Sequence, residues 1–243
     1  MRENCKYFDV GYWNSRYEAE ASYEWLVDYQ TLKEHLNGLM SRDGNILVLG
    51  CGNSSLSEDL YNDGYKRITN VDYSPVVIES MRSRSAAASS MAWLVGDVRD
   101  LDFRPSEFDT VLEKATLDSL LVRETDPWHL SAEASSLLHR VLHKVSEILR
   151  PGGRLISVSF AQPHFRSWVY GKPEYRWSVE WRSVSPSPSS DAFAYHLYWM
   201  TKGETLSSKF SSPPPWTRED RTSDGCATPV SDDEDDFLTR ISL

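Results

Sequence analysis

An apolar strand that runs directly into a glycine turn is the feature that most constrains this chain. The strand covers 45–49, and Gly50 and Gly52 follow it at once. A second apolar run at 67–71 ends on Asp72, twenty residues beyond Gly52. Parallel sheets bind ligands at the carboxyl ends of their strands, and glycine lets the backbone approach a ligand where a Cβ would collide. A carboxylate about 20 residues beyond such a turn can accept both hydroxyls of a ribose. The pattern therefore predicts a nucleoside-bearing cofactor on a Rossmann-like sheet.

Strand and helix patterns alternate along the rest of this region. Helices are expected from Pro75, which is favoured in a first turn, and before Gly64, which is favoured as a stop. The full set of predicted elements is strands at 45–49, 67–71, 92–95, 108–113 and 154–160, with helices at 55–62, from Pro75 and at 131–149. Such alternation predicts an α/β fold with a parallel, doubly wound sheet.

The pattern changes after Phe160. A short helix is predicted at 163–170, followed by two strand-like runs at 174–183 and 192–201. The Ser/Pro-rich stretch 185–190 between them is typical of a turn. Two adjacent strands joined by a short loop predict an antiparallel hairpin at the sheet edge.

The chain divides into three regions. Residues 1–44 form a helical, aromatic lead-in, in which Ser22 is the expected N-cap of a helix that runs to about Met40. Residues 45–202 form the α/β domain. Residues 203–243 are rich in Ser and Pro and include an acidic run at 232–236, a composition typical of a disordered tail.

Composition narrows the class of protein. A chain of 243 residues holds one substantial domain with a tail. No apolar run approaches the roughly 18 residues of a membrane span, and the N-terminus lacks the apolar region of a secretory signal. The three cysteines are scattered without CxxC spacing, which predicts neither a disulfide framework nor a zinc site and favours a reducing, cytoplasmic location.

The net charge of −10 argues against binding to a nucleic-acid backbone, which needs a basic face. It fits a basic protein partner, and it fits simple solubility equally well. His139 and His143 share a helical face, but they lack the Glu of an HExxH pattern and a nearby third ligand. No metal site is expected.

A glycine turn followed by a carboxylate occurs in dehydrogenases and in methyltransferases. A dinucleotide site needs a third glycine for close packing of helix on strand, and that position holds Ser55. Asp97 follows the third strand, where a carboxylate can meet an adenine amino group. The run 151–153, Pro-Gly-Gly, separates a long helix from the next strand. Together with the terminal hairpin, these features favour S-adenosyl-L-methionine.

These residues carry a resemblance to a known family. The order of 47–52, Asp72, Asp97 and 151–153 resembles the class I methyltransferases. More narrowly, Trp13, Tyr17, Trp25, 46–54 and 112–118 resemble the lysine methyltransferases of translation elongation factor 1A, over about 7–202. The resemblance implies a seven-stranded, mostly parallel sheet, S-adenosyl-L-methionine as cofactor and elongation factor 1A as protein substrate, without nucleic acid, membrane or metal. The cofactor contacts that it implies are Trp13, Tyr17, Trp25, Gly50, Asp72, Tyr73, Asp97, Val98 and Lys114.

Two positions depart from the family pattern. Val48 stands where many class I enzymes have an acidic residue, so a carboxylate contact to the methionine amino group cannot come from there. Ala115 stands where the family often has Gly, which bears on how closely a substrate approaches that loop. The Asn-Pro-Pro-Tyr pattern of some other protein methyltransferases is absent.

The resemblance assigns roles to individual side chains. Trp13, Tyr17 and Trp25 would form an aromatic wall for the sulfonium, although spacing alone explains them as packing between lead-in and sheet. Lys114 would reach the cofactor carboxylate as a point charge. Glu113 and Asp118 are the candidates for guiding an incoming lysine ammonium, and solvated loop carboxylates are the alternative reading.

Two other functions share these features. One is a non-catalytic cofactor-binding module that recognises a partner, which the missing acidic residue at Val48 favours. The other is a methyltransferase for a small molecule or RNA, because a fold does not determine its function. The acidic composition argues against RNA.

Overall fold

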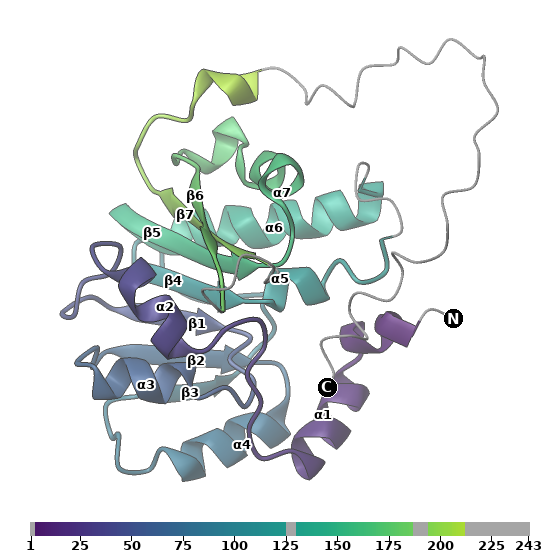
Figure 1. The fold of residues 1–243 in the computed structure, drawn as a ribbon, viewed down its shortest axis with the longest axis vertical. Coiled ribbons are helices and arrows are strands. Elements are labelled where there is room, and N and C mark those ends of the chain that lie inside the picture. The colour runs from purple at the N-terminus through teal and green to yellow at the C-terminus, as the bar shows by residue number, and fades with distance from the viewer. Residues whose placement is uncertain (1–2, 125–129, 187–193, 212–243) are drawn as a thin grey trace.

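The computed structural model describes residues 3–124, 130–186 and 194–211 of the chain (Figure 1). A seven-stranded sheet with the order β3-β2-β1-β4-β5-β7-β6 forms its centre. β1 to β5 pair in parallel, whereas β7 pairs antiparallel with both β5 and β6. The strands are β1 (Ile46–Leu49), β2 (Ile68–Asp72), β3 (Ala92–Val95), β4 (Phe108–Lys114), β5 (Leu149–Ser159), β6 (Glu180–Val184) and β7 (Tyr195–Thr201). The expected α/β sheet with its terminal antiparallel pair is confirmed.

Helices cover both faces of the sheet because its central strands β1 and β4 are buried on both sides, whereas the edge strands β3 and β6 are largely exposed. In β1, Ile46 and Val48 join one core cluster with α2, α3 and α4, whereas Leu47 and Leu49 join a second cluster with α6 and α7. A strand buried on both faces is typical of parallel sheets. The helices are α1 (Val10–Ala19), α2 (Tyr29–Leu36), α3 (Leu56–Asn62), α4 (Pro75–Arg84), α5 (Thr116–Ser119), α6 (Ala132–Ile148) and α7 (Pro163–Tyr170), with 3-10 helices at Glu3–Phe8, Pro173–Tyr175 and Ser208–Ser211.

The ends of the crossover helices follow local sequence rules. Ser74 caps α4 by accepting a hydrogen bond from the Val77 amide, and Pro75 occupies the first turn, as expected. Ser131 caps α6 in the same way through the Ala134 amide. α3 ends before Gly64, whose φ of +105° is a conformation that glycine adopts readily. These local signals explain why the crossover elements were predictable.

The helix predicted from Ser22 to about Met40 is wrong at its N-terminal end. Ser22 does not cap a helix, because residues 20–28 are not helical and α2 begins only at Tyr29, capped by Asp28. The Ser22 hydroxyl instead donates to the Asn53 carbonyl, 3.2 Å away. Figure 1 shows α1 set apart from the sheet, beside α4. Segment 20–28 therefore crosses from α1 to the sheet as an extended connection.

The carboxyl-terminal third differs from the prediction in three places. β5 begins at Leu149 and passes through the Pro-Gly-Gly run with a shift in register. A 3-10 helix at Pro173–Tyr175 stands where the first hairpin strand was expected, and β6 starts at Glu180. The predicted tail begins too early, because Phe210 is buried and packs on Trp168 of α7. The predicted turn at 185–190 lies mostly outside the described residues, as does the acidic run.

None of the helices in the described ranges is both long and apolar enough to cross a membrane.

Candidate functional site

A deep pocket lies where the carboxyl ends of β1, β2 and β4 meet the N-terminal segment. It encloses about 1230 Å³ of space, its open mouth included. The predicted site residues that line it are Trp13, Tyr17, Trp25, Gly50, Asp72, Tyr73, Asp97, Val98, Lys114 and Asp118. Asp72 and Asp97 thus share one cavity, as the strand order requires. Glu113 is the one predicted site residue that does not line the pocket.

The glycine turn is held by its neighbours in the fold. Gly50 and Gly52 have φ of +59° and +50°, in the left-handed region that glycine favours. A Cβ on Gly50 would lie 2.4 Å from the Thr116 Oγ1 atom, and one on Gly52 would lie 3.0 Å from the Tyr17 hydroxyl. The protein's own side chains, at the start of α5 and on α1, therefore require the two glycines.

Asp72 links the glycine turn to the next crossover. Its Oδ2 atom accepts a hydrogen bond from the Gly52 amide at 3.0 Å, and its Oδ1 atom accepts from the Ser74 amide at 2.9 Å. Burial raises the pKa of Asp72 to about 6, backbone hydrogen bonds oppose that rise, and the nearby charge of Asp97 adds to it. The carboxylate is rigidly placed at the tip of β2 and still has lone pairs for ribose hydroxyls.

Asp97 is partnered by a residue that sequence reasoning did not select. Arg99 Nε lies 2.8 Å from Oδ1 of Asp97, and the same guanidinium also contacts Oδ2. Partial burial raises the pKa of Asp97, but the hydrogen bonds from Arg99 outweigh burial and keep that pKa below its usual value. Asp97 therefore stays ionised at the pocket edge, with Arg99 fixing its orientation.

The N-terminal aromatic residues form one cluster that covers the pocket. Trp13 stacks on Tyr17 with ring centroids 5.6 Å apart, and it meets Trp25 edge-on at 6.1 Å. Tyr7 and Tyr23 extend the cluster through further edge contacts with Trp25. The same rings pack on one another and also line the pocket, so hydrophobic packing is compatible with the aromatic wall for a sulfonium, which stays a prediction. Such faces attract a cation by about 0.5–2 kcal/mol per well-placed ring.

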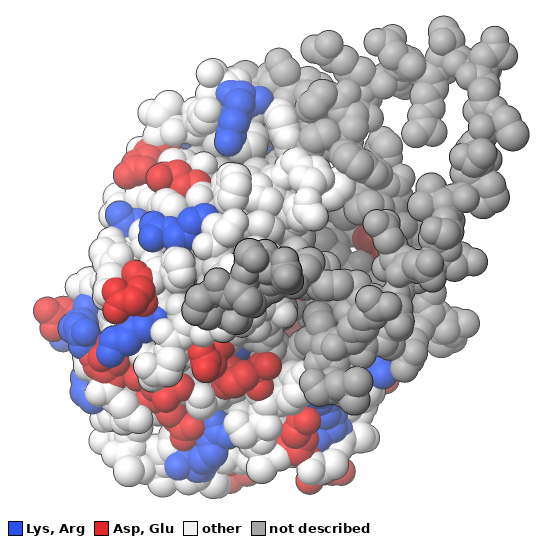
Figure 2. Space-filling model, viewed as in Figure 1, with Lys and Arg blue, Asp and Glu red and all other residues white. Residues whose placement is uncertain are grey.

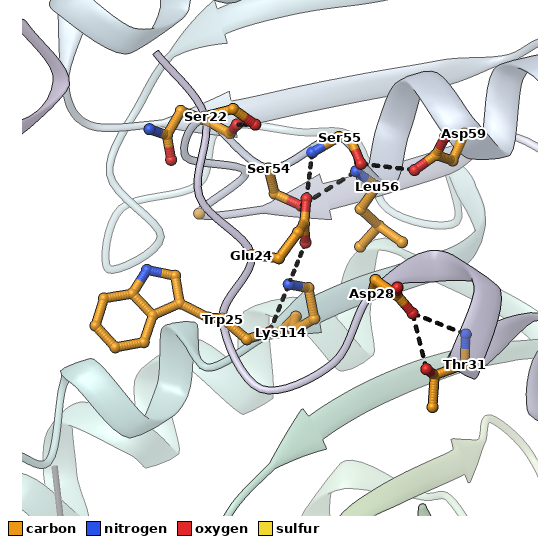
Figure 3. A network of polar contacts seen from close by, with 12 residues as sticks. Ser22, Glu24, Trp25, Asp28, Thr31, Ser54, Ser55, Leu56, Asp59 and Lys114 are labelled. Atoms are coloured by element: carbon orange, nitrogen blue, oxygen red, sulfur yellow. Dashed lines mark hydrogen bonds and ion pairs between the residues drawn. The ribbon is translucent and has the colours of Figure 1, made fainter. Parts of the chain in front are cut away.

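Lys114 is placed differently from the expected point charge on the cofactor carboxylate. Its ammonium donates to the Glu24 carboxylate at 2.9 Å and to the Trp25 carbonyl at 2.7 Å (Figure 3). Burial lowers the pKa of Lys114, and the charge of Glu24 opposes that effect. The ammonium thus ties β4 to the N-terminal segment.

Glu113 and Asp118 are not solvated loop carboxylates. Glu113 is buried in β4, where it accepts hydrogen bonds from the Ser157 hydroxyl and from the amides of Thr116 and Leu117. Burial, with the charge of Asp118 adding to it, raises the pKa of Glu113 to about 7. Since Glu113 is enclosed and does not line the pocket, it cannot receive an incoming ammonium.

Asp118 does reach the pocket. Its Oδ1 atom accepts from the Ser159 hydroxyl at 2.7 Å and from the Arg166 guanidinium, while its Oδ2 atom has no hydrogen-bond partner among the described residues. Burial raises the pKa of Asp118, and Arg166 opposes that rise. The Nη1 atom of Arg166 is likewise buried without a partner in the described ranges, and a buried polar atom without a hydrogen bond is costly.

Sequence reasoning missed Tyr7, Tyr23, Glu24 and Arg99. The apolar spacing predicts helix at Tyr23 and Glu24, which conceals that both residues lie in an extended segment beside the pocket. Arg99 follows Asp97 by two residues, and a charged neighbour that close to a candidate carboxylate was a usable signal. Within the described ranges, no His, Cys, Asp and Glu side chains gather as a metal site requires.

The pocket suits S-adenosyl-L-methionine. Two carboxylates from neighbouring strands match the hydroxyl and amino donors of an adenosine, and an aromatic cluster matches a sulfonium. A family model for a methyltransferase domain matches residues 47–157. Among solved structures, the N-methyltransferase NodS of Bradyrhizobium japonicum in complex with S-adenosyl-L-homocysteine has a TM-score of 0.54 at 19% identity, covering 79% of this chain and 99% of that one. Fold and pocket define a class I methyltransferase with S-adenosyl-L-methionine as cofactor.

Sequence relatives narrow the assignment. The EEF1A lysine methyltransferase 4 of Mus musculus is 41% identical over 252 residues, covering 99% of this chain and 94% of the relative, and that of Bos taurus is 40% identical. The eEF1A lysine and N-terminal methyltransferase of Mus musculus is 34% identical over 76% of this chain and 26% of its own length. This chain belongs to the EEF1A lysine methyltransferase family.

Proposed function

We propose that this protein transfers a methyl group from S-adenosyl-L-methionine to a lysine side chain of translation elongation factor 1A, in the cytoplasm. The observation that carries the proposal is that Asp118, a carboxylate with one oxygen unpartnered among the described residues, lines the same pocket as Asp72, Asp97 and the aromatic cluster. The names of the relatives support the identity of the protein substrate. The cytoplasmic location is supported by the scattered cysteines.

The pocket provides what methyl transfer to an amine requires. The bound cofactor supplies an activated methyl group on a sulfonium, so the protein mainly binds, orients and excludes water. Asp72 and Asp97 would hold the adenosine end of the cofactor, and the aromatic cluster would lie beside its sulfonium. Asp118, Ala115 and Phe160 line the same pocket, and we assign them to the part that would receive the acceptor lysine.

The acceptor lysine must lose a proton before it reacts. An ordinary lysine has a pKa of about 10.4, so deprotonation at pH 7 costs roughly 4.6 kcal/mol. Burial in an apolar channel and a second positive charge nearby both lower that pKa. Asp118 acts in the opposite sense and favours the ammonium, so we assign it to capture and orientation of the side chain. Desolvation by the aromatic walls then favours release of the proton.

Other acceptors fit less well. On the face seen in Figure 2, acidic and basic side chains are interspersed and do not gather into one basic patch. RNA binding depends on such a patch. A small cationic amine would also match Asp118, which makes it the alternative substrate that a direct assay must test.

The direct test is transfer of labelled methyl from S-adenosyl-L-methionine to purified elongation factor 1A. Label on one lysine, identified by mass spectrometry, is the expected result. A factor in which that lysine is replaced by arginine is the matched control and stays unlabelled. Calorimetric binding of the cofactor without label on the factor, or on any protein of a cell lysate, would favour the non-catalytic module. Label recovered only on a small molecule would favour the alternative substrate class.

Replacing Asp118 tests the capture site. Asp118→Asn keeps an acceptor for Ser159 and Arg166 but removes the charge, and a hydrogen bond to a charged group contributes about 1.5–3 kcal/mol. We expect the KM for the protein substrate to rise about 10–100-fold while the affinity for the cofactor changes less than about threefold. Steady-state kinetics with each substrate varied in turn measures both.

Arg166→Lys is the control for damage to the buried pair. It disturbs the same ion pair, keeps the Asp118 carboxylate, and does not line the pocket. We expect it to lower the melting temperature and to leave the KM for the protein substrate near the wild-type value. An equal rise in the KM for the protein substrate in both variants would contradict the assignment of Asp118 to substrate capture.

A further inference from the structure

Residues 20–26, which we call the strap, join α1 to the sheet across the pocket mouth. They are held to the glycine turn by several hydrogen bonds. The Asn53 side-chain amide donates to the Glu20 carbonyl at 2.8 Å, and the Ser22 hydroxyl donates to the Asn53 carbonyl at 3.2 Å. Arg84 of α4 donates to the Ala21 carbonyl and to the carbonyls of residues 53 and 54. The strap is therefore docked along its length.

Glu24 is the centre of this docking (Figure 3). Its carboxylate accepts from the Ser54 hydroxyl at 2.8 and 2.9 Å, from the Ser55 amide, and from the Lys114 ammonium at 2.9 Å. Ser55 occupies the position where a dinucleotide-binding turn has its third glycine. One carboxylate thus joins the strap, the start of α3 and the end of β4.

The partner of Glu24 is almost fully enclosed. The Lys114 side chain is 5% exposed, against 26% for Glu24. A buried charge that loses its counter-charge is strongly destabilised, whereas removing both charges together is often tolerated. The ammonium also donates to the Trp25 carbonyl, which accepts from the Val27 amide as well, at 2.8 Å.

The backbone beside this pair is strained. Leu26 has a φ of +64°, a left-handed conformation that a leucine adopts only when its surroundings impose it. The two hydrogen bonds to the Trp25 carbonyl lie on the peptide unit just before it. The hydrogen bonds from Lys114 and Val27 to the Trp25 carbonyl thus lie next to a strained residue, in the segment that carries Tyr23 and Trp25 into the aromatic cluster.

We propose that Glu24 and Lys114 form a positioning clamp for the cofactor site, in which the charge of Lys114 acts through Glu24 rather than on the cofactor carboxylate. The clamp keeps the strap docked and so keeps Tyr23 and Trp25 in the wall of the pocket. The inference rests on the proposed function only in that the pocket holds S-adenosyl-L-methionine. Cofactor binding without any protein substrate is enough to test it.

The test is a double-mutant cycle with calorimetric binding of S-adenosyl-L-methionine. Glu24→Gln keeps an acceptor for Ser54 and Ser55 and removes the charge, and Lys114→Met removes the ammonium and keeps the stem. We expect each single change to raise the Kd about 10–100-fold, and the double variant to raise it no more than the weaker-binding single variant. Two effects that multiply would show that Lys114 binds the cofactor directly and would overturn the clamp.

Two further readouts separate positioning from loss of fold. In Glu24→Gln, we expect the KM for cofactor to rise while kcat at saturating cofactor stays within about twofold, and amide exchange in residues 20–26 to become faster. Asp63→Asn is the matched control, because Asp63 binds Tyr29 and Lys33 of α2 and does not line the pocket. It is expected to lower stability and leave the cofactor Kd unchanged. Equal weakening in both variants would make Glu24 a general structural residue.

Ser22→Ala provides a second test of strap docking if the Glu24 variant does not fold. It removes one uncharged hydrogen bond of the same strap, and we expect it to raise the cofactor Kd about two- to fivefold with faster exchange in 20–26. An unchanged Kd together with unchanged exchange in this variant would contradict a role for strap docking.

Discussion

Asp72 shows how one residue acquires its properties from its place in the fold. It is the last residue of β2, where a parallel sheet presents ligand contacts, and two backbone amides fix both of its oxygens. Burial makes the same carboxyl easier to protonate than a free aspartate, with a pKa of about 6. Tyr17, Tyr73 and Cys51 nearby have raised pKa values and stay neutral at neutral pH, and the lowered pKa of Asp97 keeps it ionised.

Cofactor affinity should therefore depend on pH through Asp72. The carboxylate accepts ribose hydroxyls only when ionised, so affinity is complete above the pKa and is lost as the pH falls through about 6. We expect binding about 10-fold weaker at pH 5 than at pH 7.5, measured by calorimetry. Asp72→Asn should bind weakly with a flat profile across this range. A flat profile for the wild-type protein would contradict the assignment.

Among the elements, the short helix α5 starts under strain. Ala115, just before Thr116, has a φ of +64° and a ψ of +1°, which is the left-handed conformation that glycine adopts without a steric penalty. The position where the family often has Gly therefore carries a real conformational requirement, which this chain meets with alanine. The next residue, Thr116, is held against the glycine turn by a hydrogen bond from its hydroxyl to the Leu49 carbonyl at 2.9 Å.

Ala115→Gly is expected to stabilise the protein. Relief of the left-handed alanine should outweigh the entropy that glycine adds to the unfolded chain, and the net gain should be about 0.5–1 kcal/mol in the free energy of unfolding. Chemical denaturation measures it. Ala134→Gly, in the ordinary helical backbone of α6, is the control and should destabilise by about 1 kcal/mol or more. Destabilisation by both changes would refute the strain at Ala115.

At the scale of the whole molecule, a buried polar network joins the layers behind the pocket. Glu113 of β4, Ser157 of β5 and Tyr170 of α7 are linked by hydrogen bonds. Asp118 of α5 and Arg166 of α7 form the adjoining ion pair. The network connects the sheet to two helices next to the pocket. Its groups are enclosed, so their ionisation is coupled to the stability of the fold.

The raised pKa of Glu113 predicts how the stability of the protein depends on pH. Its folded-state pKa of about 7 lies above the ordinary value of 4.5, so the stabilisation from its protonated form is complete below about 4.5 and is lost as the pH rises through 7. Relative to Glu113→Gln, the wild-type free energy of unfolding should fall by about 3 kcal/mol between pH 4.5 and 8. Denaturation of both proteins at the two pH values measures this. An equal difference at both pH values would show that Glu113 titrates normally.

Much of the fold could be predicted because its signals are local. These signals involve residues that are close together in the sequence. They are the apolar residues on both faces of β1, the helix caps Ser74 and Ser131, and the glycines that end helices or turns. They define the alternation of strands and helices, and the alternation determines the parallel sheet. The spacing of Gly52 and Asp72 then predicts that the Asp72 carboxylate lies beside the glycine turn, because neighbouring parallel strands end at the same edge of the sheet.

The remaining features depend on residues far apart in the chain. The apolar spacing of 22–40 is compatible with one helix. Ser22 and Glu24 instead bind residues 53–55 and Lys114, so this part of the chain is extended and the helix begins only at Tyr29. Nothing in the sequence around Glu113 predicts that its side chain is buried, because it is enclosed only when β5 and α7 pack beside it. The sequence by itself determined the sheet, the glycine turn and the carboxylates at the strand ends. Only the tertiary structure decided which side chains close the pocket, because contacts between distant segments outweigh the weaker preferences of local backbone.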